Sequence, residues 1–111
     1  MYVYVELWNA RPEWISLSEG DRKAFMGKVN GLLEELTRSR LSLMACVLND
    51  GDTTPRVNYR YLAVWQMTDK SDVARLANGT AGIGWYKYFD QVNGGGEMVE
   101  PTVLIEEILN L

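Results

Sequence analysis

The 111-residue chain contains no histidine. This absence excludes a histidine general base, a Ser–His or Cys–His nucleophile pair, a histidine-ligated haem iron and most zinc sites. The only cysteine, Cys46, has no partner for a disulfide within the chain, which favours a reducing compartment. The remaining candidate metal ligands are carboxylates spread along the sequence, so we predict no metal and no cofactor.

Basic residues and long apolar runs are also scarce. The chain has 11 Lys and Arg against 15 Asp and Glu, a net charge of −4, and its basic residues are scattered. Nucleic acids and anionic membranes both require a basic patch, so neither is an expected partner. No run approaches the ~18 apolar residues of a membrane span, and the stretch from Met1 to Glu6 lacks the basic start of a signal peptide. We therefore expect a cytoplasmic protein that forms a single domain over residues 1–111.

The hydrophobic residues follow strand-like and helix-like periods in turn. A period of two predicts strands, and a period of 3.6 predicts helices. The expected strands cover residues 2–9, 41–49, 57–67 and 96–100, and the expected helices cover residues 18–39 and 69–93. This is strand–helix–strand twice, the βαββαβ order of ferredoxin-like α+β folds, in which an antiparallel four-stranded sheet carries its helices on one face. Pro101 is placed to begin a short C-terminal helix.

Two segments predict where these helices begin and where one of them is interrupted. Ser18 is expected to cap the first helix, whose apolar stripe runs from Phe25 to Leu36. The glycine-rich run 79–84 predicts a break in the second helix and a close approach of backbones. We expect helicity to resume over residues 85–92, and Gly94–Gly96 to form a flexible hinge before the last strand.

The third strand and the second half of the second helix also carry a family resemblance. The segment Tyr61–Asp69, with its aliphatic–x–aliphatic–Trp pattern leading into a helix, resembles the dimeric α+β barrel superfamily. The aromatic segment Gly84–Asn93, together with Trp14, Leu17-Ser18 and Phe25, is similar to a small uncharacterised bacterial family within that superfamily. The resemblance implies two sheets packed face to face with the helices outside.

A homodimer through the helix-free sheet face is therefore the expected partnership. Residues assigned to that face would otherwise leave a large apolar patch in water. The residues we assign there are Tyr4, Trp8, Leu62 and Val64.

The superfamily includes haem-degrading monooxygenases, cofactor-free monooxygenases, isomerases and binding modules, so its fold does not select a function. Its haem-degrading branch uses an Asn on the first strand, a Trp on the third strand and a His on the second helix. Trp65 matches the Trp, and Asn9 is a candidate for the Asn. No residue of this chain matches the His.

The resemblance places a ligand cleft between the sheet and the second helix. The residues transferred to that cleft are Val5, Leu7, Asn9, Tyr61, Ala63 and Trp65 on its floor, and Trp85, Tyr88 and Phe89 on its wall. These side chains either fill a packed core or line an apolar pocket with a few polar groups. In the second case, tyrosine hydroxyls favour a ligand with a carbonyl or carboxylate group.

Two functions remain open on the sequence. The first is binding of a lipophilic small molecule, such as a fatty-acid-like or aromatic carboxylate. The alternative is a cofactor-independent monooxygenase acting on quinol- or anthrone-like aromatics. That activity requires a base in the cleft, and we assign Glu6 to the opposite face of the sheet, paired with Arg60. No catalytic residue is therefore predicted.

Overall fold

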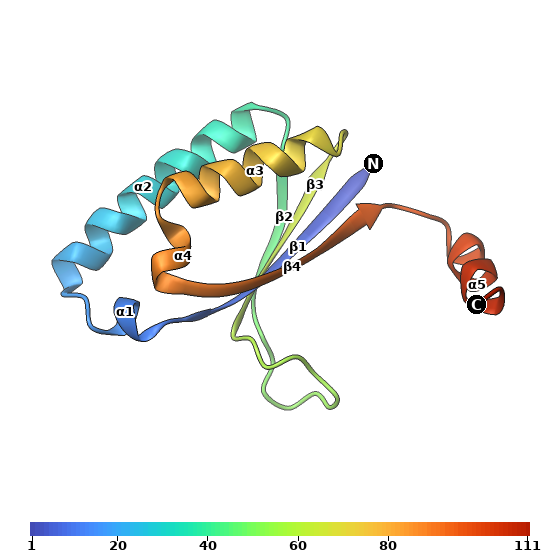
Figure 1. The fold of residues 1–111 in the computed structure, drawn as a ribbon, viewed down its shortest axis with the longest axis horizontal. Coiled ribbons are helices and arrows are strands. Elements are labelled where there is room, and N and C mark those ends of the chain that lie inside the picture. Colours follow the sequence, from blue (N-terminus) through green and yellow to red (C-terminus); the bar gives the residue numbers. More distant parts are fainter.

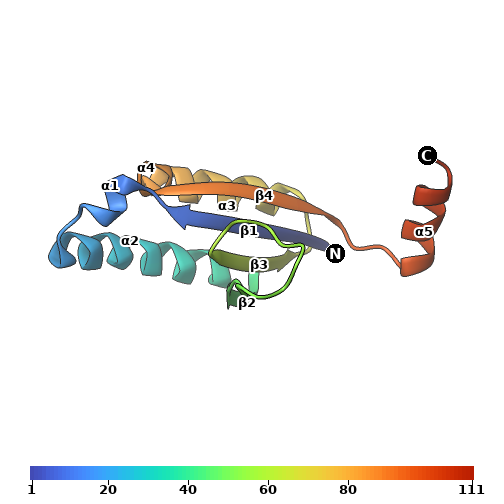
Figure 2. The same cartoon turned by 90° about the horizontal axis from the view of Figure 1, so that it is seen from below.

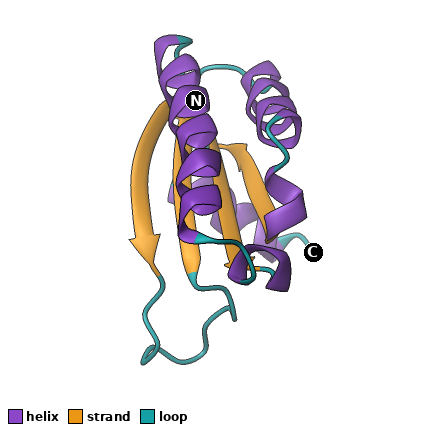
Figure 3. Ribbon diagram, turned by 90° about the vertical axis from the view of Figure 1, so that its left-hand side faces the viewer, coloured by secondary structure: helices purple, strands orange, loops and turns teal.

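The computed structural model describes residues 1–111, in which an antiparallel four-stranded sheet carries helices on one face (Figures 1 and 3). Along the chain the elements are β1 (Tyr2–Ala10), α1 (Pro12–Ile15), α2 (Glu19–Arg38), β2 (Ser42–Leu48), β3 (Tyr61–Met67), α3 (Ser71–Gly82), α4 (Trp85–Tyr88), β4 (Phe89–Glu97) and α5 (Pro101–Leu109). The strands lie in the order β2-β3-β1-β4, and every neighbouring pair is antiparallel. This arrangement confirms the predicted ferredoxin-like fold with its C-terminal helix.

Helices α2 and α3 form the layer that covers the sheet (Figure 3). The Ser18 hydroxyl accepts a hydrogen bond from the Asp21 N–H at 3.1 Å, so α2 begins where the capping residue predicts. The two helices meet at Gly79, where a Cβ would lie 2.6 Å from the Leu32 Cδ1 atom. The close approach expected from the glycine-rich run is thus confirmed. The break in helicity comes at Gly84, whose φ of +83° lies in the left-handed region.

The short helix α1 has no counterpart in the sequence prediction. Pro12 occupies its first turn, where the missing N–H leaves no hydrogen bond unmade. Arg22 of α2 holds α1 in place, because its guanidinium donates to the Trp14 carbonyl at 3.3 Å and to the Ile15 carbonyl at 2.8 Å. The Trp14 ring then packs 5.0 Å from that of Phe89, which closes one end of the helical layer.

The register of β1 reverses the predicted assignment of its two faces. Glu6 lies opposite the buried Ala63 of β3, so Glu6 points toward the helices. The same face carries Tyr2, Tyr4 and Trp8. The helix-free face instead carries Val3, Val5, Leu7, Leu62 and Val64. Alternation separates the two faces of a strand but does not say which one a helix covers. Here the aromatic residues of β1 share a face with those of β3.

Two predictions change with this register. Leu62 and Val64 lie on the helix-free face as predicted, but the assignment of Tyr4 and Trp8 to that face is wrong. The predicted pair of Glu6 with Arg60 is wrong as well. The Arg60 guanidinium lies 5.7 Å from the centre of the Tyr61 ring, while the buried Glu6 is bonded to Trp65 and Gln91 instead.

Strand β4 occupies residues predicted to be a helix and a hinge. It pairs with β1 from Phe89 to Glu97, so helicity ends at Tyr88 and Gly94–Gly96 are part of the sheet. A Cβ at Gly95 would lie 2.8 Å from both the Tyr4 ring and the Val3 carbonyl oxygen. Glycine is therefore required at position 95, because the Tyr4 ring lies over the strand. Without side chains at Gly94–Gly96, the sequence shows no alternation that would predict a strand there.

Residues 57–60 precede β3 rather than belonging to it. The side-chain amide of Asn9 donates to the Asn58 carbonyl at 3.0 Å, and its oxygen accepts from the Arg60 N–H at 2.8 Å. A side chain thus takes the place of a strand partner along this segment.

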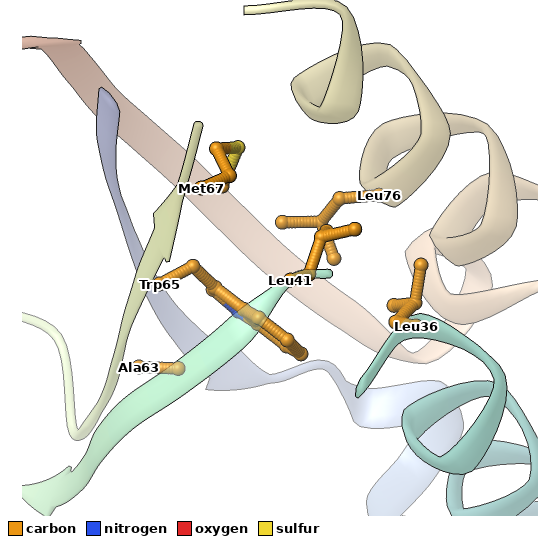
Figure 4. Packing of buried hydrophobic residues seen from close by; sticks show 6 residues of the cluster. All are labelled: Leu36, Leu41, Ala63, Trp65, Met67 and Leu76. Atoms are coloured by element: carbon orange, nitrogen blue, oxygen red, sulfur yellow. The ribbon is translucent and has the colours of Figure 1, made fainter. Parts of the chain in front are cut away.

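The buried core lies between β3 and the two long helices (Figure 4). Trp65 of β3 is 2 % exposed and projects toward the helical layer. It is surrounded by Leu36, Leu41, Ala63, Met67 and Leu76, all buried. This tryptophan therefore links the sheet to both helices.

Helix α5 lies apart from the rest of the fold, beyond the end of β4 (Figures 1 and 2). The radius of gyration is 16.1 Å, against about 13 Å for a compact domain of this length. The apolar side chains of α5 are at least half exposed: Val103, Leu104, Ile105, Ile108 and Leu109. None of the helices combines the length and the hydropathy needed to cross a bilayer.

Candidate functional site

An apolar cavity of about 160 Å³ lies between the sheet and helices α2 and α3. Of its 15 lining residues 12 are hydrophobic. They come from the α2 stripe (Val29, Leu32, Leu33, Leu36), from the strands (Glu6, Trp8, Leu43, Cys46, Ala63, Trp65, Gln91) and from the α3–α4 segment (Leu76, Thr80, Ile83, Trp85). Helix α2 therefore contributes as many lining residues as the α3–α4 segment. The family resemblance implies a wall made by the second helix alone.

The carboxyl group of Glu6 lies on the sheet side of this cavity. Glu6 is only 8 % exposed, and carboxylates are seldom buried without partners. Its Oε1 accepts a hydrogen bond from the Trp65 indole N–H at 2.6 Å, and its Oε2 accepts one from the Gln91 amide at 2.9 Å. Two donors from the neighbouring strands β3 and β4 thus hold one carboxyl group in a single orientation.

The orientation of the Gln91 amide follows from its other contacts. The Trp85 indole, which can only donate, donates to the Gln91 Oε1 at 2.8 Å. The Gln91 Nε2 must then face Glu6, and it also donates to the Asn93 Oδ1 at 2.8 Å. The chain of hydrogen bonds therefore runs from Trp85 through Gln91 to Glu6, where it meets the bond from Trp65.

Burial decides the protonation behaviour of this site. Removal from water raises the pKa of Glu6 above its ordinary value, and the hydrogen bonds from Trp65 and Gln91 offset only part of that rise. Burial, reinforced by the negative charge of Glu6, also raises the pKa values of Tyr4 and Tyr86. Glu6 is therefore a carboxyl group that takes up and releases a proton closer to neutrality than an exposed one.

Three of the residues predicted for the cleft line this cavity, namely Ala63, Trp65 and Trp85. Tyr61 and Phe89 line a second, adjoining apolar cavity of about 360 Å³. As ligand-binding residues all five remain predictions, but the structure brings them to one side of the sheet.

The other four predicted residues lie elsewhere. Val5 and Leu7 are on the helix-free face, because they pair with Val64 and Leu62 of β3. Asn9 binds the backbone of residues 58–60, as described above. Tyr88 packs against Phe25, with ring centres 4.9 Å apart.

Glu6 and Gln91 are the polar residues that the sequence reasoning missed. The predicted face of Glu6 is wrong. Its spacing of two residues from Tyr4 and from Trp8 puts one charged residue within an aromatic face of the strand. Gln91 was assigned to a helix. Placing it on β4, opposite Trp8, would have brought it next to Glu6.

Trp8 is shared by three apolar cavities. It lines the cavity above Glu6, the 360 Å³ cavity, and a third apolar cavity of about 180 Å³ that opens toward β2. Its ring stacks on Tyr61 at 5.8 Å and meets Trp85 edge-on at 5.6 Å. No group of three or more His, Cys, Asp or Glu side chains is arranged to hold a metal ion.

We expect Glu6 to make the stability of the protein fall with rising pH. Because its pKa is higher in the folded than in the unfolded chain, the folded state holds the proton more tightly. The free energy of unfolding should therefore decrease as pH rises from about 4.5 through the raised pKa. Glu6→Gln should remove that decrease, measured by urea unfolding at several pH values, whereas Glu19→Gln on the exposed face of α2 should retain it. Equal slopes for wild type and Glu6→Gln would contradict the assignment.

Comparison with solved structures identifies the fold. A variant of chlorite dismutase from Candidatus Nitrospira defluvii matches with a TM-score of 0.74 at 15 % identity, over 95 % of this chain and 42 % of that one. The protein At3g17210 from Arabidopsis thaliana matches with a TM-score of 0.60 at 9 % identity, over 90 % and 97 % of the two chains. A dimeric ferredoxin-like protein of unknown function from Thermobifida fusca matches with a TM-score of 0.54 at 12 % identity, over 87 % and 90 %.

These similarities show a ferredoxin-like fold, which confirms the fold that the resemblance in the sequence implies. The chain spans less than half the length of the chlorite dismutase chain it matches. Comparison with curated protein sequences gives no match. Over residues 1–111 the sequence matches the model of the Family of unknown function (DUF6616), and the chain belongs to that family.

Proposed function

We propose that the cavity above Glu6 binds one small lipophilic molecule per chain. The observation that carries this proposal is an apolar cavity of about 160 Å³ with a single oriented carboxyl group. Apolar cavities with a few fixed polar groups are typical of small-molecule sites. An apolar cavity of about 150 Å³ accommodates benzene, so the size supports a ligand of one ring.

The geometry changes the expected kind of ligand. A fatty-acid chain is too long for this cavity and would have to continue past Trp8 into the adjoining one. A carboxylate would bring a second negative charge next to Glu6, and like charges at such a distance repel strongly in an apolar site. The proposed ligand is therefore small and carries no carboxylate.

Filling the cavity should abolish binding. Ala63 is buried and lines the cavity opposite Glu6 on the neighbouring strand, so Ala63→Leu places extra carbons where the ligand would lie. We expect wild-type protein to bind toluene, and Ala63→Leu to weaken binding at least about tenfold, measured by ligand-observed NMR. Ala74→Leu, on the exposed side of α3, is the matched control and should bind like wild type. Undetectable binding of toluene to the wild type would show that the cavity is only a packing defect.

A second candidate function is the cofactor-independent oxidation of quinol-like aromatics by oxygen. The observation in its favour is Glu6, which supplies the cleft with the base that the sequence reasoning could not find there. A carboxylate of raised pKa in an apolar site is suited to removing a proton from a phenolic hydroxyl. Oxygen uptake with a panel of hydroquinones tests this function. If it is correct, uptake should occur and should be lost in Glu6→Gln. A flat trace with every hydroquinone would eliminate it.

We also infer that the chain acts as a homodimer through its helix-free sheet face. The aliphatic face of β1 and β3 is covered by no helix of the chain, and α5 exposes its own apolar side chains. The accessible surface is 7647 Å², whereas a compact monomer of 12.6 kDa exposes about 6,200 Å². The excess is roughly 1,400 Å² per chain. If each of two copies buries that much, the interface has the size of an obligate homodimer.

Helix α5 alone cannot cover the exposed sheet face. Its nine residues are about 14 Å long, while four strands of up to nine residues form a surface of roughly 19 by 30 Å. Folding α5 back on its own chain would therefore leave most of that face in water. A second copy covers the sheet with its own sheet and offers a surface for α5 as well.

A charge on the free face should disrupt this dimer. Val5→Lys places an ammonium group at the centre of the proposed interface, and Val57→Lys, in the exposed loop before β3, is the control. By light scattering at micromolar concentration we expect twice 12.6 kDa for wild type and control. Val5→Lys should shift the mass toward the monomer or precipitate. A wild-type mass of 12.6 kDa would contradict the homodimer.

A further inference from the structure

The hydrogen-bond donors that contact Glu6 and Gln91 are all used within the protein. The Trp65 indole donates to Glu6, the Trp85 indole donates to Gln91, and both hydrogens of the Gln91 amide are shared between Glu6 and Asn93. The nearby Thr80 hydroxyl donates to the Leu76 carbonyl at 2.8 Å. The donors of Trp65, Trp85, Gln91 and Thr80 are therefore not available to a ligand.

The acceptors on the same side are only partly used. An ionised carboxyl group has about four acceptor positions, and Glu6 accepts one hydrogen bond at each oxygen. The Gln91 Oε1 accepts one bond and has a second lone pair. The hydroxyls of Tyr4 and Tyr86, whose pKa values respond to the charge of Glu6, do not line the cavity. The unpartnered donors among the lining residues are the Trp8 indole and the Cys46 thiol, which also line a neighbouring cavity and donate no hydrogen bond to Glu6.

We infer that the cavity selects a neutral, single-ring molecule that donates a hydrogen bond to Glu6, such as a phenol, a ring alcohol or an N–H heterocycle. This inference rests on the proposed function and names the ligand class of the same site. One hydroxyl or N–H placed on Glu6 occupies one of the open acceptor positions, while the ring fills the apolar remainder of the cavity.

Other one-ring ligands conflict with the same arrangement. A carbonyl oxygen would face the lone pairs of Glu6 and Gln91 with no N–H between them. A carboxylate adds charge repulsion to that conflict. A ring ammonium would also find acceptors on Glu6 and Gln91, but moving a charged group out of water into an apolar cavity costs more free energy than moving a neutral hydroxyl.

The test compares one-ring probes of similar size on the full chain. Toluene, phenol, benzaldehyde, benzoate and benzylamine are titrated at pH 8, and affinities are measured by ligand-observed NMR. A hydrogen bond to a charged group has a strength that corresponds to a tenfold or greater difference in affinity. We expect phenol to bind about tenfold or more tightly than benzaldehyde, with toluene in between and the two charged probes weakest.

The variant Glu6→Gln isolates the carboxyl group. Its side-chain amide adds N–H donors at the cavity, so the advantage of phenol over benzaldehyde should fall to about twofold or less while toluene affinity stays within about twofold. Glu107→Gln, on the exposed helix α5, is the matched control and should keep the wild-type ratio. If Glu6→Gln does not fold, the ratios on wild-type protein decide the question by themselves.

The outcomes separate the inference from the proposed function. If toluene binds but phenol is no tighter than benzaldehyde, or if benzoate or benzylamine binds tightest, the inference is wrong and the small-molecule site stands. An unchanged phenol advantage in Glu6→Gln also overturns the inference. If no probe binds, toluene included, the proposed function fails and the inference fails with it.

Discussion

The hydrogen bond between the Glu6 carboxyl and the Trp65 indole is the contact on which the rest of the structure depends. It joins β1 to β3 at 2.6 Å, inside the layer where the helices meet the sheet. Trp65 is also the largest buried side chain of the core, so the group that orients the carboxyl is itself held by packing from α2 and α3. A buried carboxyl lowers stability unless its oxygens are bonded. The fold therefore requires the Trp65 and Gln91 donors wherever it retains Glu6, and the polar site and the apolar core form one unit.

Much of the fold follows from local patterns in the sequence. Ser18 and the stripe of α2 define that helix almost to the residue, because capping and a 3.6-residue period are local properties. The order of strands and helices is correct for the same reason. Strand β4 was not recognised, since Gly94–Gly96 carry no side chains from which alternation can be seen, and since Trp85 and Phe89 mimic helical spacing. What reveals β4 is its pairing with β1, a contact between distant parts of the chain.

For the candidate site, the sequence predicts which residues of β3 face the helices, but it does not predict this for β1. Ala63 and Trp65 line the cavity on the face that the resemblance in β3 assigns to the cleft, and their role in ligand binding stays a prediction. In β1 both faces are apolar enough to be buried, and an aliphatic face looks more like a core than a face with a glutamate. Two hydrogen bonds to Glu6, from Trp65 and Gln91 on other strands, stabilise the observed orientation, and neither is local in sequence.

Trp8 has a consequence for the range of molecule sizes that the protein can hold. It is the one residue common to all three apolar cavities, so the position of its indole affects the volume of each of them. Tryptophan side chains occupy discrete rotamers. The capacity of the site is therefore expected to change in steps and not gradually: a single ring while the indole stands between Tyr61 and Trp85, and an elongated molecule once it turns aside. One side chain would thus set the capacity of the site while the backbone stays in place.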